Sequence, residues 1–531
     1  MEEPPGQNHR REQHKANSLI PHKRTPLLQS PLLFGDLLLM RLDAGFNHFL
    51  SPRQSALVWE RDHAQYRRAR SLISFRICLT SPRPVADDNL FRGPANAGRD
   101  GAYFMKVLIL GSGGREHALA WAVSRSARVT EIVCAPGNGG IAQVARCVPV
   151  DLKSVDDMVR LVEAEAPALT IVGPELPLSL GIVDALQARD LRVFGPSQAA
   201  SRLESSKAFA KQFMKRHQIP TAKYAVCASA KELEKDIAFF HAPIVVKADG
   251  LAAGKGVLIC DSRNAALEAA HGLFDGTLLG EASQQVVLEE FLQGEEISFL
   301  CLSDGKHVAP LVPAQDHKRI GEHDTGLNTG GMGVYSTDSM LEPQMTEWIL
   351  HHIAEPTVRG MAEEGTPFVG VLYCGLMMTP RGPEVLEFNA RFGDPETQAI
   401  VLRLESELLD ALEACVDGTL AQTALRWSPG ASACVVTSSA GYPGNYKTGL
   451  PISGLTNAAM VPTVQVFHSG TSRFGNQLVT SGGRVLAVAA QGDSLRETLA
   501  RAYQALAEIQ FEGMYFRRDI GHRALQPAGK S

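Results

Sequence analysis

Residues 385–391 place two oxygen donors and a cation within one short apolar stretch. Successive side chains of a β-strand point to opposite faces, so the alternation here predicts a strand with one packed face and one polar face. The packed set is Leu386, Phe388 and Ala390, and the polar set is Glu387, Asn389 and Arg391. A carboxylate and an amide oxygen beside a fixed guanidinium suit Mg²⁺ bound to phosphates. The alternative is an edge strand with a solvated polar face; the Gly/Asp/Pro turn at residues 392–397 favours a ligand site.

A glycine-rich turn follows the first strongly apolar run, at residues 111–117 (GSGGREH). A dinucleotide fingerprint would need glycine at position 116, where this chain has Glu116. Backbone N–H groups at the start of the next helix, with Arg115 beside them, suit a single phosphate better than a pyrophosphate. A plain strand-to-helix turn is the alternative.

A second glycine loop, at residues 249–257, lies between two apolar runs. It is no Walker A loop, because Gly256 follows Lys255 and the chain continues as a strand rather than a helix. The pattern predicts a hairpin flap whose backbone amides can close over a polyphosphate, with Lys247 as a point charge at the end of the first strand. The alternative is a mobile turn.

Residues 286–298 predict a strand, a short link and a second strand. The link could offer backbone hydrogen bonds to a flat base, and Glu296 could accept hydrogen bonds from ribose hydroxyls. A solvated turn is the alternative. His317 and His323 have no partner at metal-ligand spacing, which favours a role in a polar loop.

The 531 residues are enough for three or four domains at roughly 100–200 residues each. Nine scattered cysteines without CxxC pairs indicate reduced thiols and a cytoplasmic protein. No apolar run approaches the ~18 residues that span a bilayer. A net charge of −5 argues against nucleic acid as a partner.

Residues 1–104 differ from the rest, with 15 Arg/Lys, 10 Asp/Glu and no sustained periodicity. Three interpretations compete: a targeting peptide, a disordered regulatory tail, or a start assigned upstream of the true one at Met105. Glu2, Glu3 and Glu12 are wrong for a transit peptide, and we expect the third. No function is assigned to this extension.

From Met105 onward strand-like and helix-like segments alternate, which predicts a parallel sheet flanked by helices. The expected strands are residues 107–110, 132–135, 169–172 and 191–194. Ligands of such sheets bind at the carboxyl ends of the strands, where the glycine turns of this chain lie. Beyond residue 430, strands at 433–437 and 484–489 and a helix at 494–509 predict a small α+β domain.

Several ordered passages together resemble the ATP-grasp superfamily and, within it, the phosphoribosylamine–glycine ligase family. They are VLILGSGGREHAL (107–119), DGLAAGKGV (249–257), QDHKR (315–319), DTGLNTGGMG (324–333) and LEFNARFGDPETQ (386–398). The resemblance covers residues 105–531. It implies an N-terminal Rossmann-like domain at 105–206, an ATP-grasp domain at 207–429 with a hairpin lid at about 225–290, and a C-terminal α+β domain at 430–531.

The resemblance also implies a reaction. ATP and Mg²⁺ or Mn²⁺ would serve to join glycine to 5-phosphoribosylamine through glycyl phosphate, in purine biosynthesis. The expected partners are these small molecules, without nucleic acid or membrane, and the protein is expected to be a monomer.

Site residues follow by resemblance alone. Glu387 and Asn389 would hold the metal, and Arg391 would steady the acyl phosphate. ATP would be bound by Lys207, Lys247, Gly254, Lys255, Gly256, Glu289, Glu290, Leu292 and Glu296. Phosphoribosylamine and glycine would be bound by Gly113, Gly114, Arg115, Glu116, Glu175, Gly330, Gly331, Asp394 and Pro395.

Three alternatives remain open. One is an ATP-grasp ligase that uses another acid in place of glycine, which product analysis would separate. A second is a nicotinamide-dependent oxidoreductase on the first sheet, against which Glu116 argues. The third is a catalytically silent nucleotide-binding protein, which turnover would exclude.

Overall fold

The computed structural model describes residues 104–251, 256–278, 280 and 283–525. The extension before residue 104 and the lid residues Gly254 and Lys255 lie outside these ranges. In the described part of the chain, no helix is long and apolar enough to cross a membrane.

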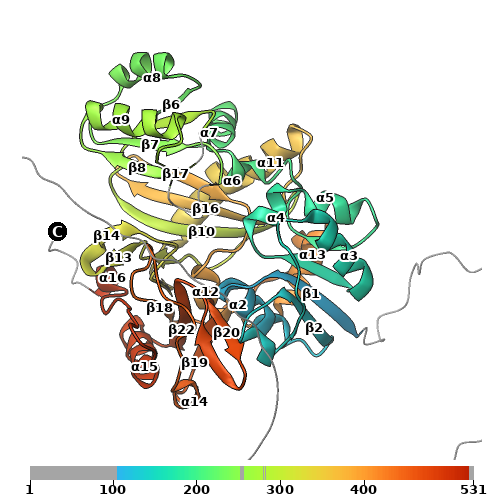
Figure 1. The fold of residues 1–531 in the computed structure, drawn as a ribbon. Coiled ribbons are helices and arrows are strands. Elements are labelled where there is room, and N and C mark those ends of the chain that lie inside the picture. Colours follow the sequence, from blue (N-terminus) through green and yellow to red (C-terminus); the bar gives the residue numbers. More distant parts are fainter. Residues whose placement is uncertain (1–103, 252–255, 279, 281–282, 526–531) are drawn as a thin grey trace, which may run out of the picture. The chain divides into compact units, whose positions relative to one another are not determined.

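The N-terminal segment forms a five-stranded parallel sheet in the order β3-β2-β1-β4-β5 (Figure 1). Its central strand β1 (Met105–Gly111) is almost entirely apolar and buried, as expected for a strand covered on both faces. The remaining strands are β2 (Val129–Pro136), β3 (Arg146–Cys147), β4 (Leu169–Val172) and β5 (Val193–Phe194). The helices are α2 (Gly114–Val123), α3 (Val155–Glu165), α4 (Glu175–Ser179), α5 (Ile182–Gln187) and α6 (Arg202–Ser205). The parallel sheet predicted from the sequence is confirmed.

Two antiparallel sheets follow. The first, in the order β6-β9-β7-β8, contains the predicted hairpin, since β7 and β8 pair antiparallel on either side of the glycine loop. Helices α8 and α9 cover one face of this sheet (Figure 1). The elements are α7 (Lys207–Arg216), β6 (Tyr224–Cys227), α8 (Ala230–Asp236), β7 (Ile244–Ala248), β8 (Val257–Cys260), α9 (Arg263–Phe274) and β9 (Val286–Glu290). We call the four-stranded sheet β6-β9-β7-β8 the lid sheet.

The second antiparallel sheet has the order β11-β10-β16-β17, and its last strand carries Glu387 and Asn389. Its strands are β10 (Glu295–Asp304), β11 (Val308–Pro310), β16 (Val369–Thr379) and β17 (Gly382–Asn389). Helices α10 (Pro343–Ile349), α11 (Glu355–Glu363), α12 (Glu396–Arg403) and α13 (Leu408–Val416) lie between or after these strands in the sequence.

Strand β17 is irregular at the position where simple alternation was predicted. Gly375 pairs with Glu387 and Leu376 pairs with Val385, so Leu386 is an extra residue in a β-bulge. The bulge changes the phase of alternation: Val385 packs in the same apolar cluster as Phe388 and Ala390, whereas Leu386 is only half-buried and lies outside that cluster. The prediction of Leu386 on the packed face was therefore wrong.

A third sheet combines strands that are distant in the sequence, in the order β12-β15-β18-β22-β19. Two of its strands, β12 (Gln315–Asp316) and β15 (Gly333–Thr337), come from the middle of the chain. The others are β18 (Ala431–Ser438), β19 (Val464–His468) and β22 (Arg484–Gly492), with helix α15 (Leu495–Glu508) packed on β18 and β22. The expected C-terminal domain thus shares its sheet with residues from before position 430. Smaller elements are β13 (Arg319–Gly321), β14 (Thr325–Asn328), α14 (Leu455–Ala458), β20 (Thr471–Phe474), β21 (Gln477–Thr480) and α16 (His522–Leu525).

Three histidines are buried in this framework. Burial lowers the pKa of His117 and of His317 to about 3, and that of His468 to about 4. The Nε2 atom of His317 accepts a hydrogen bond from the N–H of Gly521, and its Nδ1 lies 3.2 Å from the carbonyl oxygen of Gly333. The ring therefore joins two distant segments in its neutral form.

Acid should destabilise the fold through these histidines. Between about pH 6.5 and about pH 3 an unfolded histidine binds a proton that folded His317 does not, so the free energy of unfolding falls as the pH falls through this window. The His317→Gln variant has no imidazole to bind that proton in the unfolded state. Its melting temperature should therefore fall less between about pH 6.5 and about pH 5 than that of the unmodified protein. Calorimetry over this range measures it, and His241→Gln, at an exposed histidine, is the control. An unchanged pH dependence in His317→Gln would contradict the assignment.

Candidate functional site

On the side of β17 away from its apolar cluster lie the side chains of Glu387, Asn389 and, just after the strand, Arg391. Asn389 Oδ1 accepts a hydrogen bond from Arg391 Nη2 at 3.1 Å, and the Glu387 side chain keeps 37% of its surface exposed. Burial alone would raise the pKa of Glu387, but the ammonium groups of Lys318, Lys247 and Lys207 outweigh it and lower that pKa. Several cations thus surround one accessible carboxylate.

Lys247 is held by a row of alternating charges. Glu289 lies between two lysines, with one oxygen 2.8 Å from Lys247 Nζ and the other 2.8 Å from Lys211 Nζ. Lys247 Nζ also donates to the carbonyl oxygen of Leu386, the bulged residue, at 3.1 Å. This contact joins the lid sheet to β17. Because Glu289 is 1% exposed and both of its oxygens face lysines, it positions cations and does not face a ligand directly.

Lys211 was not among the predicted site residues. It lies one helical turn after Lys207, and this four-residue spacing on α7 is the signal that could have identified it. Burial lowers its pKa to about 8, while the adjacent Glu289 opposes the shift. Its ammonium group also donates to Thr221 Oγ1 at 2.7 Å.

Lys207 occupies the first position of α7. Its ammonium group donates to the carbonyl oxygen of Gly250 at 2.8 Å, at the start of the glycine loop. Ser206 caps the helix by accepting from the N–H of Phe209, and Asp249 accepts from the N–H of Ala208. Burial lowers the pKa of Lys207. Residues 249–250, at the start of the loop, are thereby fixed to the start of the helix.

Glu296 pairs with a lysine that the prediction omitted. Lys318 Nζ contacts Glu296 Oε1 and lies 3.7 Å from Glu387 Oε1. Burial would lower the pKa of Lys318, but the two carboxylates outweigh it and raise the pKa well above its usual range. Lys318 lies in the QDHKR passage, so the motif contained the residue although no role was given to it.

The link between β9 and β10 is anchored by Glu290. Its carboxylate accepts from the N–H of Lys223 and from Arg381 Nη2, each at 2.9 Å, and its own N–H donates to the carbonyl oxygen of Lys223. Leu292 is 6% exposed, and within the described residues its N–H donates to no backbone carbonyl. The carbonyl oxygen of Gly256 accepts a hydrogen bond from the N–H of Ala248. This bond extends the pairing of β7 and β8 toward the glycine loop.

The first glycine turn is filled by Glu116. One of its oxygens accepts from the N–H of Gly113 at 2.5 Å, and the other contacts Arg115 Nε at 2.6 Å. A Cβ at Gly111 or at Gly173 would overlap the Glu116 side chain. The residue that argued against a dinucleotide fingerprint therefore occupies the turn itself.

A second carboxylate, from Asp394, lies at the start of α2. Burial would raise its pKa, but Arg484, Arg115 and a hydrogen bond from the N–H of Arg115 lower it. Gln398 Nε2 donates to Asp394 Oδ1 at 2.7 Å, and a Cβ at Gly114 would overlap Gln398. The helix start that was predicted to bind a phosphate is thus lined by the protein's own carboxylates.

Arg484, on β22, was not predicted as a site residue from the sequence. Its Nη2 lies 3.3 Å from Asp394 Oδ2, and its Nη1 donates to the carbonyl oxygens of Asp394, Gly330 and Gly331. Gly331 has a φ of +106°, and a Cβ there would overlap Pro395 and lie 2.7 Å from Asp316 Oδ1. No local pattern singles out Arg484, because its partners lie some 90 to 150 residues away in the sequence.

Arg391 connects this region to the cation cluster. Its Nη2 lies 2.9 Å from Glu204 Oε1 and its Nε lies 3.4 Å from Glu175 Oε2. Glu175 is also 3.9 Å from Arg115 Nη2, and Arg115 Nη1 donates to the carbonyl oxygen of Phe392. The predicted residues of the first domain and those around β17 therefore meet at Arg391.

The donor set on β17 fits a hard divalent cation. Glu387 and Asn389 offer one carboxylate and one amide oxygen from the same side of a strand, and Glu387 remains accessible. Two protein ligands suit Mg²⁺, which keeps waters and takes its remaining ligands from phosphates. His317 is fully buried between backbone groups, and His323 lies in a short turn beside Asp519.

Three consecutive parts of the chain match domains of one family. Residues 105–204 match the phosphoribosylglycinamide synthetase N domain, residues 205–397 its ATP-grasp (A) domain, and residues 432–523 its C domain. A phosphoribosylamine–glycine ligase of Xanthomonas campestris pv. campestris is 49% identical over 428 residues, which cover 79% of this chain and 98% of the relative. One from Vibrio cholerae is 48% identical over 427 residues, covering 79% and 99%.

Solved structures agree with this match. The crystal structure of phosphoribosylamine–glycine ligase from Thermotoga maritima is 33% identical, with a TM-score of 0.69, and covers 78% of this chain and 100% of that one. The biotin carboxylase domain of 2-oxoglutarate carboxylase from Hydrogenobacter thermophilus, solved with MgADP, has a TM-score of 0.61 at 16% identity, covers 78% and 92%, and supports the fold alone. With the three domains matched in order over a shared fold, the chain belongs to the phosphoribosylglycinamide synthetase family.

Proposed function

We propose that this protein joins glycine to 5-phosphoribosylamine in an ATP-dependent ligation, giving glycinamide ribonucleotide, ADP and phosphate in purine biosynthesis. The main support is the group of cations at the accessible carboxylate of Glu387: Lys318 Nζ lies 3.7 Å from that carboxylate, and Lys247 Nζ donates to the carbonyl oxygen of the preceding residue, Leu386. Phosphoryl transfer depends on placing fixed positive charge around the transferring group, and this cluster provides it.

The nucleotide would lie between the lid sheet and β17. Lys207 and Lys247 would contact its phosphates, with Glu289 and Lys211 holding Lys247 in place. The carbonyl of Glu290 and the N–H of Leu292 would form hydrogen bonds with the adenine, and the Glu296 carboxylate would accept hydrogen bonds from the ribose hydroxyls. Gly254, Lys255 and Gly256 would close over the phosphates.

Glu387 and Asn389 would hold Mg²⁺ or Mn²⁺, which when bound supplies charge neutralisation to the phosphates. In the first step, a carboxylate oxygen of glycine attacks the γ-phosphorus of ATP; the bond to the β–γ bridging oxygen breaks, and glycyl phosphate and ADP form. Arg391 would stabilise the charge on the transferring phosphoryl group.

In the second step the amine of phosphoribosylamine attacks the glycyl carbonyl. The carbon–oxygen bond to phosphate breaks, the nitrogen loses a proton and an amide forms. Arg115, Glu175, Gly330, Gly331, Asp394 and Pro395 would line this part of the site. Glu116, Gly113 and Gly114 would shape it, because the Glu116 carboxylate is already bound within its own loop.

We also propose the division into parts at 105–206, 207–429 and 430–531, with strands β12 and β15 crossing into the third sheet. The eight cysteines of the described chain are free thiols, which supports a cytoplasmic protein. A monomer is proposed.

Glu387→Gln should lower glycine-dependent ADP release by about a hundredfold or more, because it removes the charge that holds the metal while preserving side-chain volume. The half-saturating Mg²⁺ concentration should rise as well. The assay is ADP release with glycine and phosphoribosylamine over a metal titration, with circular dichroism to verify folding. Glu295→Gln, at an exposed carboxylate on β10, is the control. Near-normal turnover in Glu387→Gln would refute the metal assignment.

Glu289→Gln should mainly raise the KM for ATP. Removing one partner of a buried ion pair leaves the other charge uncompensated, at a cost of roughly 3–5 kcal/mol, and here two lysines lose their shared partner. We expect a rise in KM of about tenfold or more, with a smaller change in kcat. Steady-state kinetics with varied ATP tests this against the same Glu295→Gln control. An unchanged KM for ATP would show that the Lys247 ammonium does not depend on Glu289.

A further inference from the structure

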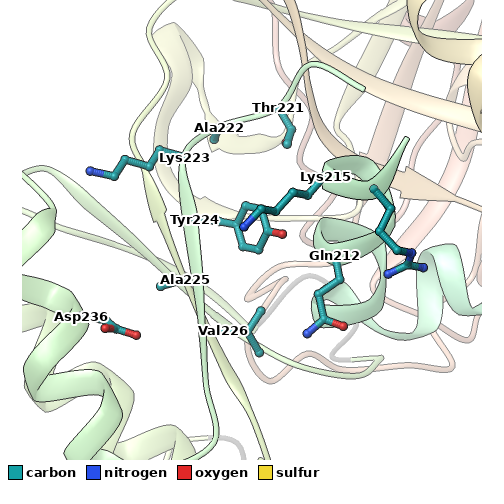
Figure 2. A pocket seen from close by; sticks show the side chains of 10 residues that line it. Gln212, Lys215, Thr221, Ala222, Lys223, Tyr224, Ala225, Val226 and Asp236 are labelled. Carbon is teal, nitrogen blue, oxygen red and sulfur yellow. The ribbon is translucent and has the colours of Figure 1, made fainter. Parts of the chain in front are cut away.

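A groove of about 760 Å³ lies between α7 and the outer strand of the lid sheet, β6 (Figure 2). Of its lining residues, Thr221 and Lys223 also contact residues of the site described above. Its lining includes Gln212, Lys215 and Arg216 from α7, Thr221 from the following loop, and Tyr224 and Val226 from β6. The groove is largely open to solvent, so a ligand would keep part of its surface exposed there.

Two cations line the α7 side of the groove. Lys215 is exposed, and within the described residues its ammonium group makes no hydrogen bond or ion pair. Arg216 is fixed by Glu364, which binds its Nε and Nη2 at 2.8 and 2.9 Å, so its Nη1 is left without a partner there. A guanidinium held in this way presents its remaining N–H groups at a defined place, as binding of an anion requires.

The β6 side supplies an aromatic ring and backbone donors. Figure 2 shows the Tyr224 side chain projecting from the strand toward the side of the groove that carries Lys215. The carbonyl of Lys223 accepts from the N–H of Glu290, so by antiparallel alternation the N–H groups of Tyr224 and Val226 point away from β9, toward the free edge of the sheet. The Gln212 amide, also in the groove, can both donate and accept.

We propose that this groove binds a second ligand, a phosphate monoester attached to a planar ring. The phosphate would lie at Lys215 and Arg216, and the ring would stack on Tyr224. Stacking on an aromatic side chain and charge-assisted hydrogen bonds to phosphate are the interactions that these side chains provide.

The groove is connected to the nucleotide machinery by two hydrogen bonds at Thr221. Its hydroxyl accepts from Lys211 Nζ at 2.7 Å and donates to the carbonyl oxygen of Val385 at 2.6 Å. Lys211 in turn pairs with Glu289, and Val385 lies two residues before Glu387. A ligand that shifts Thr221 therefore changes the positions of the Lys247 ammonium group and of β17. Binding in the groove should consequently alter the affinity for nucleotide.

AMP is the probe, with the nucleotide site first saturated by MgADP. Isothermal titration should detect one further equivalent of AMP on the full chain. Lys215→Glu should weaken this binding by about tenfold or more, because it reverses a phosphate contact. Lys231→Glu, which makes the same charge change on the exposed face of α8, should leave it unchanged. Absence of the further equivalent, or equal binding by Lys215→Glu and the unmodified protein, would overturn the proposal.

Thr221→Val tests the coupling, since it preserves shape and removes both hydrogen bonds. Coupling between two sites is reciprocal, so AMP should change the dissociation constant of MgADP in the unmodified protein by about fivefold or more, on the order of 1 kcal/mol. In Thr221→Val, AMP should still bind while this effect disappears. An effect of unchanged size in Thr221→Val would refute the connection through Thr221.

Discussion

The structure depends on one buried row of charges, in which Glu289 separates the ammonium groups of Lys211 and Lys247. A buried ammonium group is costly unless it is paired and hydrogen-bonded, and two adjacent ones would repel each other. The intervening carboxylate resolves both problems. It leaves Lys247 free to bond the carbonyl of Leu386, so that one side chain connects the lid sheet to the strand that carries Glu387.

The β-bulge at Leu386 supplies the backbone carbonyl to which this row of charges is bonded. It places Val385, Phe388 and Ala390 in one apolar cluster while Glu387, Asn389 and Arg391 leave the packed side together. The unpaired residue also lies where the Lys247 ammonium can reach its carbonyl oxygen. A regular strand would put Val385 and Phe388 on opposite faces. The irregularity therefore belongs to the site and is no defect of the sheet.

On the side away from the lid, carboxylates from distant segments are balanced by arginines. Glu116 fills the first glycine turn, Asp394 lies at the start of α2, and Arg484 joins Asp394 to the Gly330–Gly331 loop. Arg391 and Arg115 bring Glu175 into the same group. Most of these charged groups are paired with one another, so the group is held in place by the protein itself, and a ligand that binds there would meet a lower cost of ordering.

The sequence alone determined what depends on short-range pattern. Apolar runs and glycine turns identified the parallel sheet, the lid hairpin and the strand bearing Glu387, because periodicity and turn chemistry are local properties. The resemblance of ordered motifs identified the family, which the matched domains confirm. Tertiary structure alone decided which charges meet. Glu289 was predicted to bind ATP, and only the structure shows that it separates two lysines, while Lys318 and Arg484 received no role because their partners are remote in the chain. Only packing brings segments that are remote in the sequence within hydrogen-bonding distance, and no local pattern records which of many possible carboxylates an arginine or lysine will bind.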